Sequence, residues 1–165
     1  MHRWYHAPHV LRWFSYRPHT YAEIAAKYLP RIRGEVPTDP YLILYAEQPI
    51  GYIQTYRISD HPEYNQYVQA DEHTAGLDLF IGEGEYLQRG LSGPILREFL
   101  RQIVFRQDWA ERCVVGPEPD NQVAIRAYEK AGFHYWKTVQ IPDEPQPEIL
   151  MSIHRSELAM DAQGK

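Results

Sequence analysis

The sequence has only one cysteine among its 165 residues, which excludes an internal disulfide and a cysteine-rich metal site. Cys113 lies in the apolar stretch RCVVG, where a thiol ordinarily packs as a small hydrophobic side chain. No base is visibly paired with it, so the sequence does not favour a cysteine nucleophile. The motif HExxH is also missing, and we expect no metal cofactor.

Long apolar runs are absent although hydrophobic residues make up 44% of the chain. No stretch approaches the roughly 18 residues that a membrane-spanning helix needs. The N-terminus MHRWYHAPHV lacks the charged region and apolar stretch of a signal peptide. We therefore expect a cytoplasmic protein that does not engage a membrane.

An excess of positive charge is missing as well. The chain carries 17 basic and 22 acidic residues, a formal net charge of -5. This balance argues against nucleic-acid binding and is compatible with a cationic ligand. The length fits one domain of ordinary size, and no repeat or linker divides it, so we expect a single domain over residues 1–165.

Periodic apolar residues predict a mixed α/β domain with the order two helices, three strands, helix, strand, helix, two strands. At least one strand–helix–strand crossover demands a parallel pair of strands. The first helix is broken by Pro8, the turn between the first two strands lies around Gln48 and Pro49, and residues 59–73 read as a polar loop. The expected elements span residues 4–14, 21–32, 41–47, 50–58, 74–82, 93–105, 112–116, 121–133, 135–141 and 148–154.

The turn LQRGLSG (87–93) separates a predicted buried strand from an amphipathic helix. Unpaired N–H groups at the start of such a helix can hold a diphosphate. Gly90 and Gly93 permit the close backbone approach that a bound phosphate needs. Glycine also serves ordinary tight turns, so this feature by itself leaves both interpretations open.

Residues 121–133 carry the pattern N-x-x-A-x-x-x-Y-E-K-x-G-F, which resembles motif B of the GNAT acetyltransferases. The turn LQRGLSG lies one strand upstream, where that family keeps its acetyl-CoA loop. Of the usual loop pattern Q/R-x-x-G-x-G/A only Gly90 matches, because Leu87 and Ser92 occupy the other two specified positions. Main-chain donors do not depend on side-chain identity, so the resemblance still implies acetyl-CoA as cosubstrate.

Within that fold the sequence is most similar to the aminoglycoside 6'-N-acetyltransferases. The resemblance implies acetyl transfer to a primary amine of a small polycationic molecule, most closely the 6'-amine of an aminoglycoside. Acyltransferases of hydroxamate-siderophore assembly, which act on lysine-type amines, share the run D-L-F-I-G and are an alternative. Other amine acceptors and a non-catalytic acyl-CoA-binding module also stay open. The resembling pieces are W-x-x-x-P-H-V-x-x-W-F from Trp4, K-Y-L-P at 27–30, P-Y at 40–41, P-I-G-Y-I-Q-T-Y at 49–56, G-L-D at 76–78 and I-R-A-Y-E-K-A-G-F at 125–133.

Two residues carry the chemistry in this resemblance. Asp78 matches the carboxylate that takes a proton from the amine, and Tyr128 matches the tyrosine that protonates the leaving thiolate. The surroundings of Asp78 support a special role, because a carboxylate flanked by apolar residues is costly to desolvate. Binding to local backbone remains the alternative for Asp78, and core packing is the alternative for Tyr128.

Further contacts follow from the same resemblance. Acetyl-CoA contacts are implied for Leu79, Phe80, Gln88, Arg89, Gly90, Leu91, Ser92, Gly93 and Asn121, the last of which also reads as a helix cap. Acceptor contacts are implied for Trp13, Gln54, Tyr56 and Asp143. The acidic residue that the family has after its fifth strand aligns with Gly116, and whether Glu118 replaces it is open.

The family's fold opens on a strand before its first helix, whereas Trp4 to Phe14 already resembles that helix. We therefore expect the usual first strand to be lacking. Either the start lies too far downstream, or the sheet begins with residues 41–47 as an edge that another chain could cover. The protein is accordingly expected to be a monomer or a homodimer.

Overall fold

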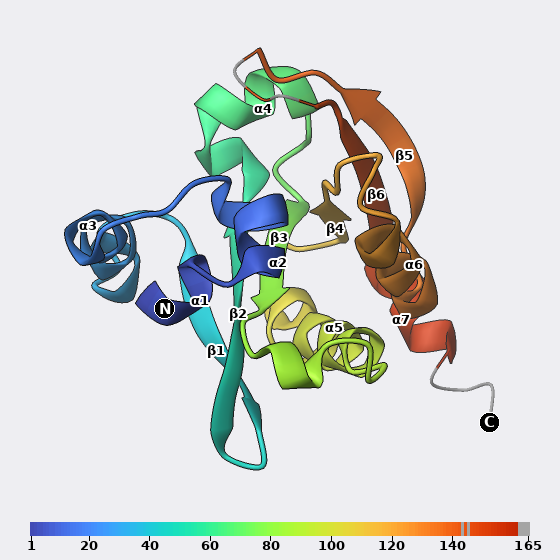
Figure 1. Ribbon diagram of the computed structural model, residues 1–165. Coiled ribbons are helices and arrows are strands. Elements are labelled where there is room, and N and C mark those ends of the chain that lie inside the picture. The colour runs from blue at the N-terminus through green and yellow to red at the C-terminus, as the bar shows by residue number, and fades with distance from the viewer. Residues whose placement is uncertain (143, 145, 162–165) are drawn as a thin grey trace. The chain divides into compact units, whose positions relative to one another are not determined.

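The computed structural model describes residues 1–142, 144 and 146–161, coloured from blue to red in Figure 1. These residues form two compact units, which we call the first and the second unit. The strands hydrogen-bond in the order β1-β2-β3-β4-β6-β5, which confirms the predicted mixed α/β fold. The first unit holds Met1–Tyr56 and Asp78–Leu91, and the second holds Arg57–Leu77 and the described residues from Ser92 onward.

The chain begins with a broken helix, as Pro8 predicts. Helix α1 (His2–Tyr5) is followed by α2 (Pro8–Val10), where proline takes the first helical position because it has no N–H to lose there. A π-helical turn over Leu11–Ser15 continues it and ends at Tyr16, whose φ of 59° is left-handed. The sheet starts only after these helices, with β1 at its edge.

Helix α3 (Tyr21–Ile32) is fixed at its start by a complete capping box. Thr20 Oγ1 accepts from the Glu23 N–H at 3.2 Å, and the Glu23 carboxylate accepts from the Thr20 N–H at 2.7 Å. Ile24 and Tyr28 are buried at a spacing of four, so one helix face packs inward. The sequence predicted the helix over residues 21–32.

Strands β1 (Asp39–Tyr45) and β2 (Gln48–Arg57) form the expected antiparallel hairpin, which projects as a long ribbon in Figure 1. The predicted turn position was wrong by two residues. Tyr45 already pairs with Gln48, so the turn consists of Ala46 and Glu47, whose φ angles of 47° and 65° are both left-handed. Pro49 is tolerated in β2 because it lies at the register shift of this hairpin.

Residues 59–73 are not the polar loop that the sequence predicted. A 3-10 turn over Ile58–Asp60 leads into α4 (Pro62–Val68). Proline at the helix start and the burial of Ile58 and Val68 explain the difference, because two apolar anchors hold an otherwise polar segment on the core.

The remaining strands and helices follow the predicted order. Strands β3 and β4 pair in parallel over Thr74–Gly76 and Arg112–Val114, as the crossover through α5 demands. The final helix, α7, was not predicted. No helix among the described residues has the length and apolarity of a membrane span. The bounds are β3 Thr74–Ile81, α5 Ser92–Gln102, β4 Arg112–Val115, α6 Gln122–Ala131, β5 His134–Val139, β6 Glu148–His154 and α7 Arg155–Asp161.

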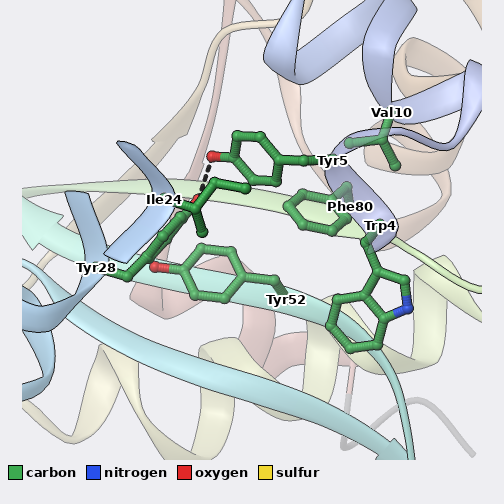
Figure 2. Packing of buried hydrophobic residues seen from close by; sticks show 7 residues of the cluster. All are labelled: Trp4, Tyr5, Val10, Ile24, Tyr28, Tyr52 and Phe80. Atoms are coloured by element: carbon green, nitrogen blue, oxygen red, sulfur yellow. Dashed lines mark hydrogen bonds between the residues drawn. The ribbon is translucent and has the colours of Figure 1, made fainter. Parts of the chain in front are cut away.

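The first unit has a mainly aromatic core, drawn in Figure 2. Phe80 of β3 lies near its centre, with ring centroids 6.1 Å from Tyr5 and 5.8 Å from Tyr52. Because side chains two apart on a strand share a face, Asp78 lies on the same face of β3 as this core residue. The aromatic packing therefore fixes the stretch of strand that carries Asp78. The cluster consists of Trp4, Tyr5, Val10, Ile24, Tyr28, Tyr52 and Phe80.

Candidate active site

Three residues named from the sequence meet in the first unit. Gln54 and Tyr56 stand at alternate positions of β2 and so project from one face. The Gln54 Nε2 donates to Asp78 Oδ2 at 2.7 Å, and the Tyr56 hydroxyl also hydrogen-bonds to the Asp78 carboxylate. The fold thus joins the proposed base to two proposed acceptor contacts.

The other end of the Gln54 amide is held as well. Its Oε1 accepts from the Tyr52 hydroxyl at 2.7 Å and from Arg31 Nη1 of α3 at 2.6 Å. An amide oxygen accepts and an amide nitrogen donates, so these two donors orient Nε2 toward Asp78.

Sequence reasoning missed Tyr52 and Arg31 as members of this site. Tyr52 could have been identified from its position two residues before Gln54, because side chains two apart on a strand project from the same face. Arg31 follows the buried Ile24 and Tyr28 by seven and three residues, and this helical spacing places it on the inward face of α3.

Burial dominates the electrostatics of Asp78 and raises the pKa of its carboxyl. The Gln54 bond, the charges of Arg31 and Lys27, and the Tyr56 bond each lower that pKa, but together they do not cancel the burial effect. A raised pKa suits a carboxylate that accepts a proton near neutral pH. Burial also raises the pKa of Tyr52 to about 12, so its hydroxyl remains a donor to Gln54.

The backbone beyond Asp78 offers a donor for a developing oxyanion. The parallel ladder of β3 ends at Gly76, so Leu79 and Phe80 lie beyond it. The Gly82 N–H donates to Ile50 of β2 at 2.7 Å. Because N–H groups alternate along a strand, we expect the Phe80 N–H to face β2 and the Leu79 N–H to face away from it. Leu79 is accordingly the better placed of the two predicted donors.

The turn over 88–93 combines left-handed backbone with open space beside its glycines. Gln88 and Gly90 are left-handed, with φ of 59° and 72°, and no atom lies within 4 Å of a Cβ placed on Gly90 or Gly93. Helix α5 starts at Ser92, so the N–H groups of Leu91, Ser92 and Gly93 have no intrahelical acceptor. The Arg89 guanidinium stacks over the Tyr86 ring at 5.2 Å, beside these donors in sequence. Phosphate contacts here remain predictions.

In the second unit Asn121 is a helix cap, as its sequence context predicted. Its Oδ1 accepts from the Ala124 N–H at 3.2 Å, and Gly132 ends α6 with a φ of 103°. Tyr128 is buried, with its ring 5.7 Å from that of Phe133. Packing and a catalytic hydroxyl are compatible in one tyrosine, so the role of Tyr128 stays a prediction.

A carboxylate lies beside Gly116, where the resembling family carries an acidic side chain. A Cβ on Gly116 would stand 2.5 Å from Oε2 of Glu148, the first residue of β6. The same oxygen accepts from the Tyr64 hydroxyl at 2.8 Å. Sequence reasoning considered Glu118 for this place, and the structure adds the Glu148 carboxylate as a second candidate.

The remaining predicted acceptor contacts are less defined. Trp13 lies half-buried in the π-helical turn, with the Arg12 guanidinium 4.5 Å from its ring centroid. Asp143 falls outside the described residues, so its contact remains a prediction. Cys113 is fully buried in β4, as expected for a packing residue.

Comparison with known proteins gives a consistent picture. A family profile described as an acetyltransferase (GNAT) domain matches residues 1–141. The aminoglycoside N(6')-acetyltransferase type 1 of Klebsiella pneumoniae is 29% identical over 148 residues, which are 88% of this chain and 73% of that protein. The structure is also similar to that of the aminoglycoside acetyltransferase AAC(6')-Ib with coenzyme A and kanamycin, at a TM-score of 0.87 and 27% identity over 98% of this chain and 91% of that one. Spermidine N-acetyltransferase of Vibrio cholerae shares the fold, with a TM-score of 0.72 and 15% identity over 96% of this chain and 89% of that one.

Proposed function

Because the chain belongs to the GNAT acetyltransferase family, we propose that it transfers the acetyl group of acetyl-CoA to the 6'-amine of an aminoglycoside. The observation that carries this proposal is the setting of the Asp78 carboxylate. Burial raises the pKa of this carboxyl, and hydrogen bonds from Gln54 and Tyr56 hold it in place. The relatives that act on aminoglycosides support the choice of acceptor. Such an activity would confer resistance to these antibiotics.

The reaction is a direct transfer. The amine nitrogen attacks the thioester carbonyl and forms the N–C bond, while its proton passes to the Asp78 carboxylate. The backbone N–H of Leu79 stabilises the carbonyl oxygen as it gains charge. The C–S bond then breaks, and the Tyr128 hydroxyl protonates the thiolate of CoA. No covalent enzyme intermediate is needed, and proximity supplies much of the acceleration.

The 88–93 turn holds the diphosphate of CoA in this proposal. We expect Gly90→Pro to weaken CoA binding by about tenfold or more, because it removes one N–H donor to a charged group and its fixed φ of about -65° cannot match the 72° found here. Isothermal titration calorimetry with CoA measures the change. Gly90→Ala keeps the donor at a strained φ and should weaken binding less. Equal affinity in the proline variant and the parent would place the diphosphate elsewhere.

A second candidate acceptor is favoured by one observation. Arg31 and Lys27 bring two positive charges from α3 close enough to Asp78 to lower its pKa. An amine that also carries a carboxylate, as lysine-type siderophore precursors do, would be attracted by these charges, whereas a polycation would be repelled.

An acceptor panel decides between the candidates. Acetyl-CoA consumption should be fastest with kanamycin-like aminoglycosides, compared with N-hydroxylysine, lysine derivatives and polyamines. The apparent KM for aminoglycosides should rise with salt, because the chain's net charge of -5 attracts a polycation and salt screens that attraction. If lysine-type acceptors outcompete every aminoglycoside, the siderophore alternative holds. If the protein binds CoA but acetylates none of these amines, the result supports the alternative of a non-catalytic acyl-CoA-binding module.

A further inference from the structure

Helix α3 contributes a charged side chain to the site that the family resemblance does not assign. Arg31 is half-buried near the end of α3, and its guanidinium lies 5.2 Å from the Tyr28 ring centroid. Tyr28 itself is buried in the aromatic cluster and hydrogen-bonds through its hydroxyl to Tyr5. Arg31 is therefore stacked on a fixed ring, which limits where its guanidinium can go.

The guanidinium reaches Asp78 through one intermediate residue. Arg31 Nη1 donates to Gln54 Oε1 at 2.6 Å, and Gln54 Nε2 donates to Asp78 Oδ2 at 2.7 Å. If the Gln54 amide turned over, its oxygen would face the Asp78 carboxylate and its nitrogen would face the guanidinium, and both contacts would be repulsive. Arg31 thus opposes the unproductive orientation of Gln54 from the far end.

The charge of Arg31 matters in addition to its hydrogen bond. Within the first unit Asp78 is faced by Tyr52, Gln54 and Tyr56 from β2 and by Lys27 and Arg31 from α3. Only the last two are cations. The Lys27 ammonium lies 5.7 Å from the ring centroids of Tyr5, Phe14 and Tyr28, whereas Arg31 is joined to the carboxylate by the hydrogen-bonded chain. Arg31 is the cation that is structurally coupled to the base.

We propose that Arg31 is a positioning residue for acetyl transfer, which orients the Gln54 amide toward Asp78 and favours the ionised form of that carboxylate. This inference rests on the proposed function, because it assumes that Asp78 is the base. A positioning role differs from a purely structural one in a measurable way, because loss of Arg31 should then change the titration of the Asp78 carboxyl group. Tyr52 also donates to Gln54 Oε1, so removal of Arg31 takes away a charge and one of the two donors that orient the amide.

The test follows the Asp78 carboxyl carbon by 13C NMR through a pH titration of the acceptor-free protein, with Asp78→Asn assigning the signal. Arg31→Met should raise the pKa of Asp78 by about one unit, because an opposite charge nearby favours the ionised form by at least that amount. Arg31→Lys, which keeps the charge, should shift it by less than half as much. Arg33→Met is the matched control, since Arg33 pairs with Glu35 on the same helix end and should leave the titration unchanged.

The kinetic counterpart is the acidic limb of kcat/KM against pH. In Arg31→Met the midpoint of this limb should move to higher pH by the same amount as the Asp78 pKa measured by NMR. This shift lowers kcat/KM about tenfold at the acid end of the profile and less at pH 8. An unchanged Asp78 titration in a folded Arg31→Met protein overturns the proposal. The proposal is also overturned if Arg31→Met raises KM while the acidic limb of the pH profile stays in place, because that result indicates a direct contact between Arg31 and the acceptor. The NMR titration needs no acceptor, so failure to acetylate any amine would count against the proposed function and not against the role of Arg31.

Discussion

Replacing Asp78 with asparagine is expected to lower turnover by roughly 10²-fold or more while leaving CoA affinity nearly intact. General-base catalysis contributes at that scale, and an amide cannot accept the amine proton. Gln54 can still donate to the new side-chain oxygen, so the local hydrogen bonds largely survive. Steady-state kinetics with the best acceptor and calorimetry with CoA make the two measurements.

Stability separates this catalytic role from a structural one. Burial raises the pKa of Asp78 above its ordinary value of 3.8, so its contribution to stability is greatest below that value and is lost as pH rises through the raised pKa. Asparagine carries no charge to desolvate, and the variant should melt at the same or a higher temperature at pH 7 to 8. Asp39→Asn, at an exposed start of β1, is the matched control for loss of one charge. A marked fall in melting temperature with Asp78→Asn would favour a structural carboxylate, and unchanged turnover would remove Asp78 from the mechanism.

Gly51→Ala is expected to destabilise the protein by about 3 kcal/mol, the upper part of the range for overpacked interiors. A Cβ at Gly51 would lie 2.4 Å from the carbonyl oxygen of Phe80 and 3.0 Å from the Cα of Ile81. Both are backbone atoms and cannot rotate away, so β2 and β3 must separate locally. Since Phe80 follows Asp78 by two residues, activity should fall together with stability.

Thermal unfolding measures this effect, with an expected fall in Tm of about 10 °C for a chain of this size. Gly84→Ala is the matched control, because nothing lies within 4 Å of a Cβ there and its φ is not left-handed. Its Tm should remain within about 2 °C of the parent, as for ordinary surface substitutions. Equal Tm values in the Gly51 and Gly84 variants would contradict the close approach of β2 to β3.

Much of the fold was predictable because its signals are local. The helix over residues 21–32 and the Asn121 cap both depend on residues that are close in sequence, and both were confirmed. The errors fell where tertiary contacts override local preference. Helix α4 forms in a polar stretch because Ile58 and Val68 are buried, and burial is not visible in the segment itself.

The candidate site shows the same division. Asp78, Gln54 and Tyr56 were named individually from the sequence, through resemblance and through the cost of a carboxylate among apolar residues. That a Gln54 amide bridges Asp78 to Arg31 was not predictable, because the chain separates Arg31 from Gln54 by 23 positions and Gln54 from Asp78 by 24.

The sequence by itself determined the family, the order of the elements and the identity of the proposed base, since each depends on residue type and on spacing along the chain. Only the tertiary structure decided the burial that raises the pKa of Asp78, the orientation of Gln54 and the position of the Glu148 carboxylate beside Gly116. The physical reason is distance. Burial, charge pairs and hydrogen bonds act over a few ångströms in space, and the sequence order does not specify which distant residues come within that range.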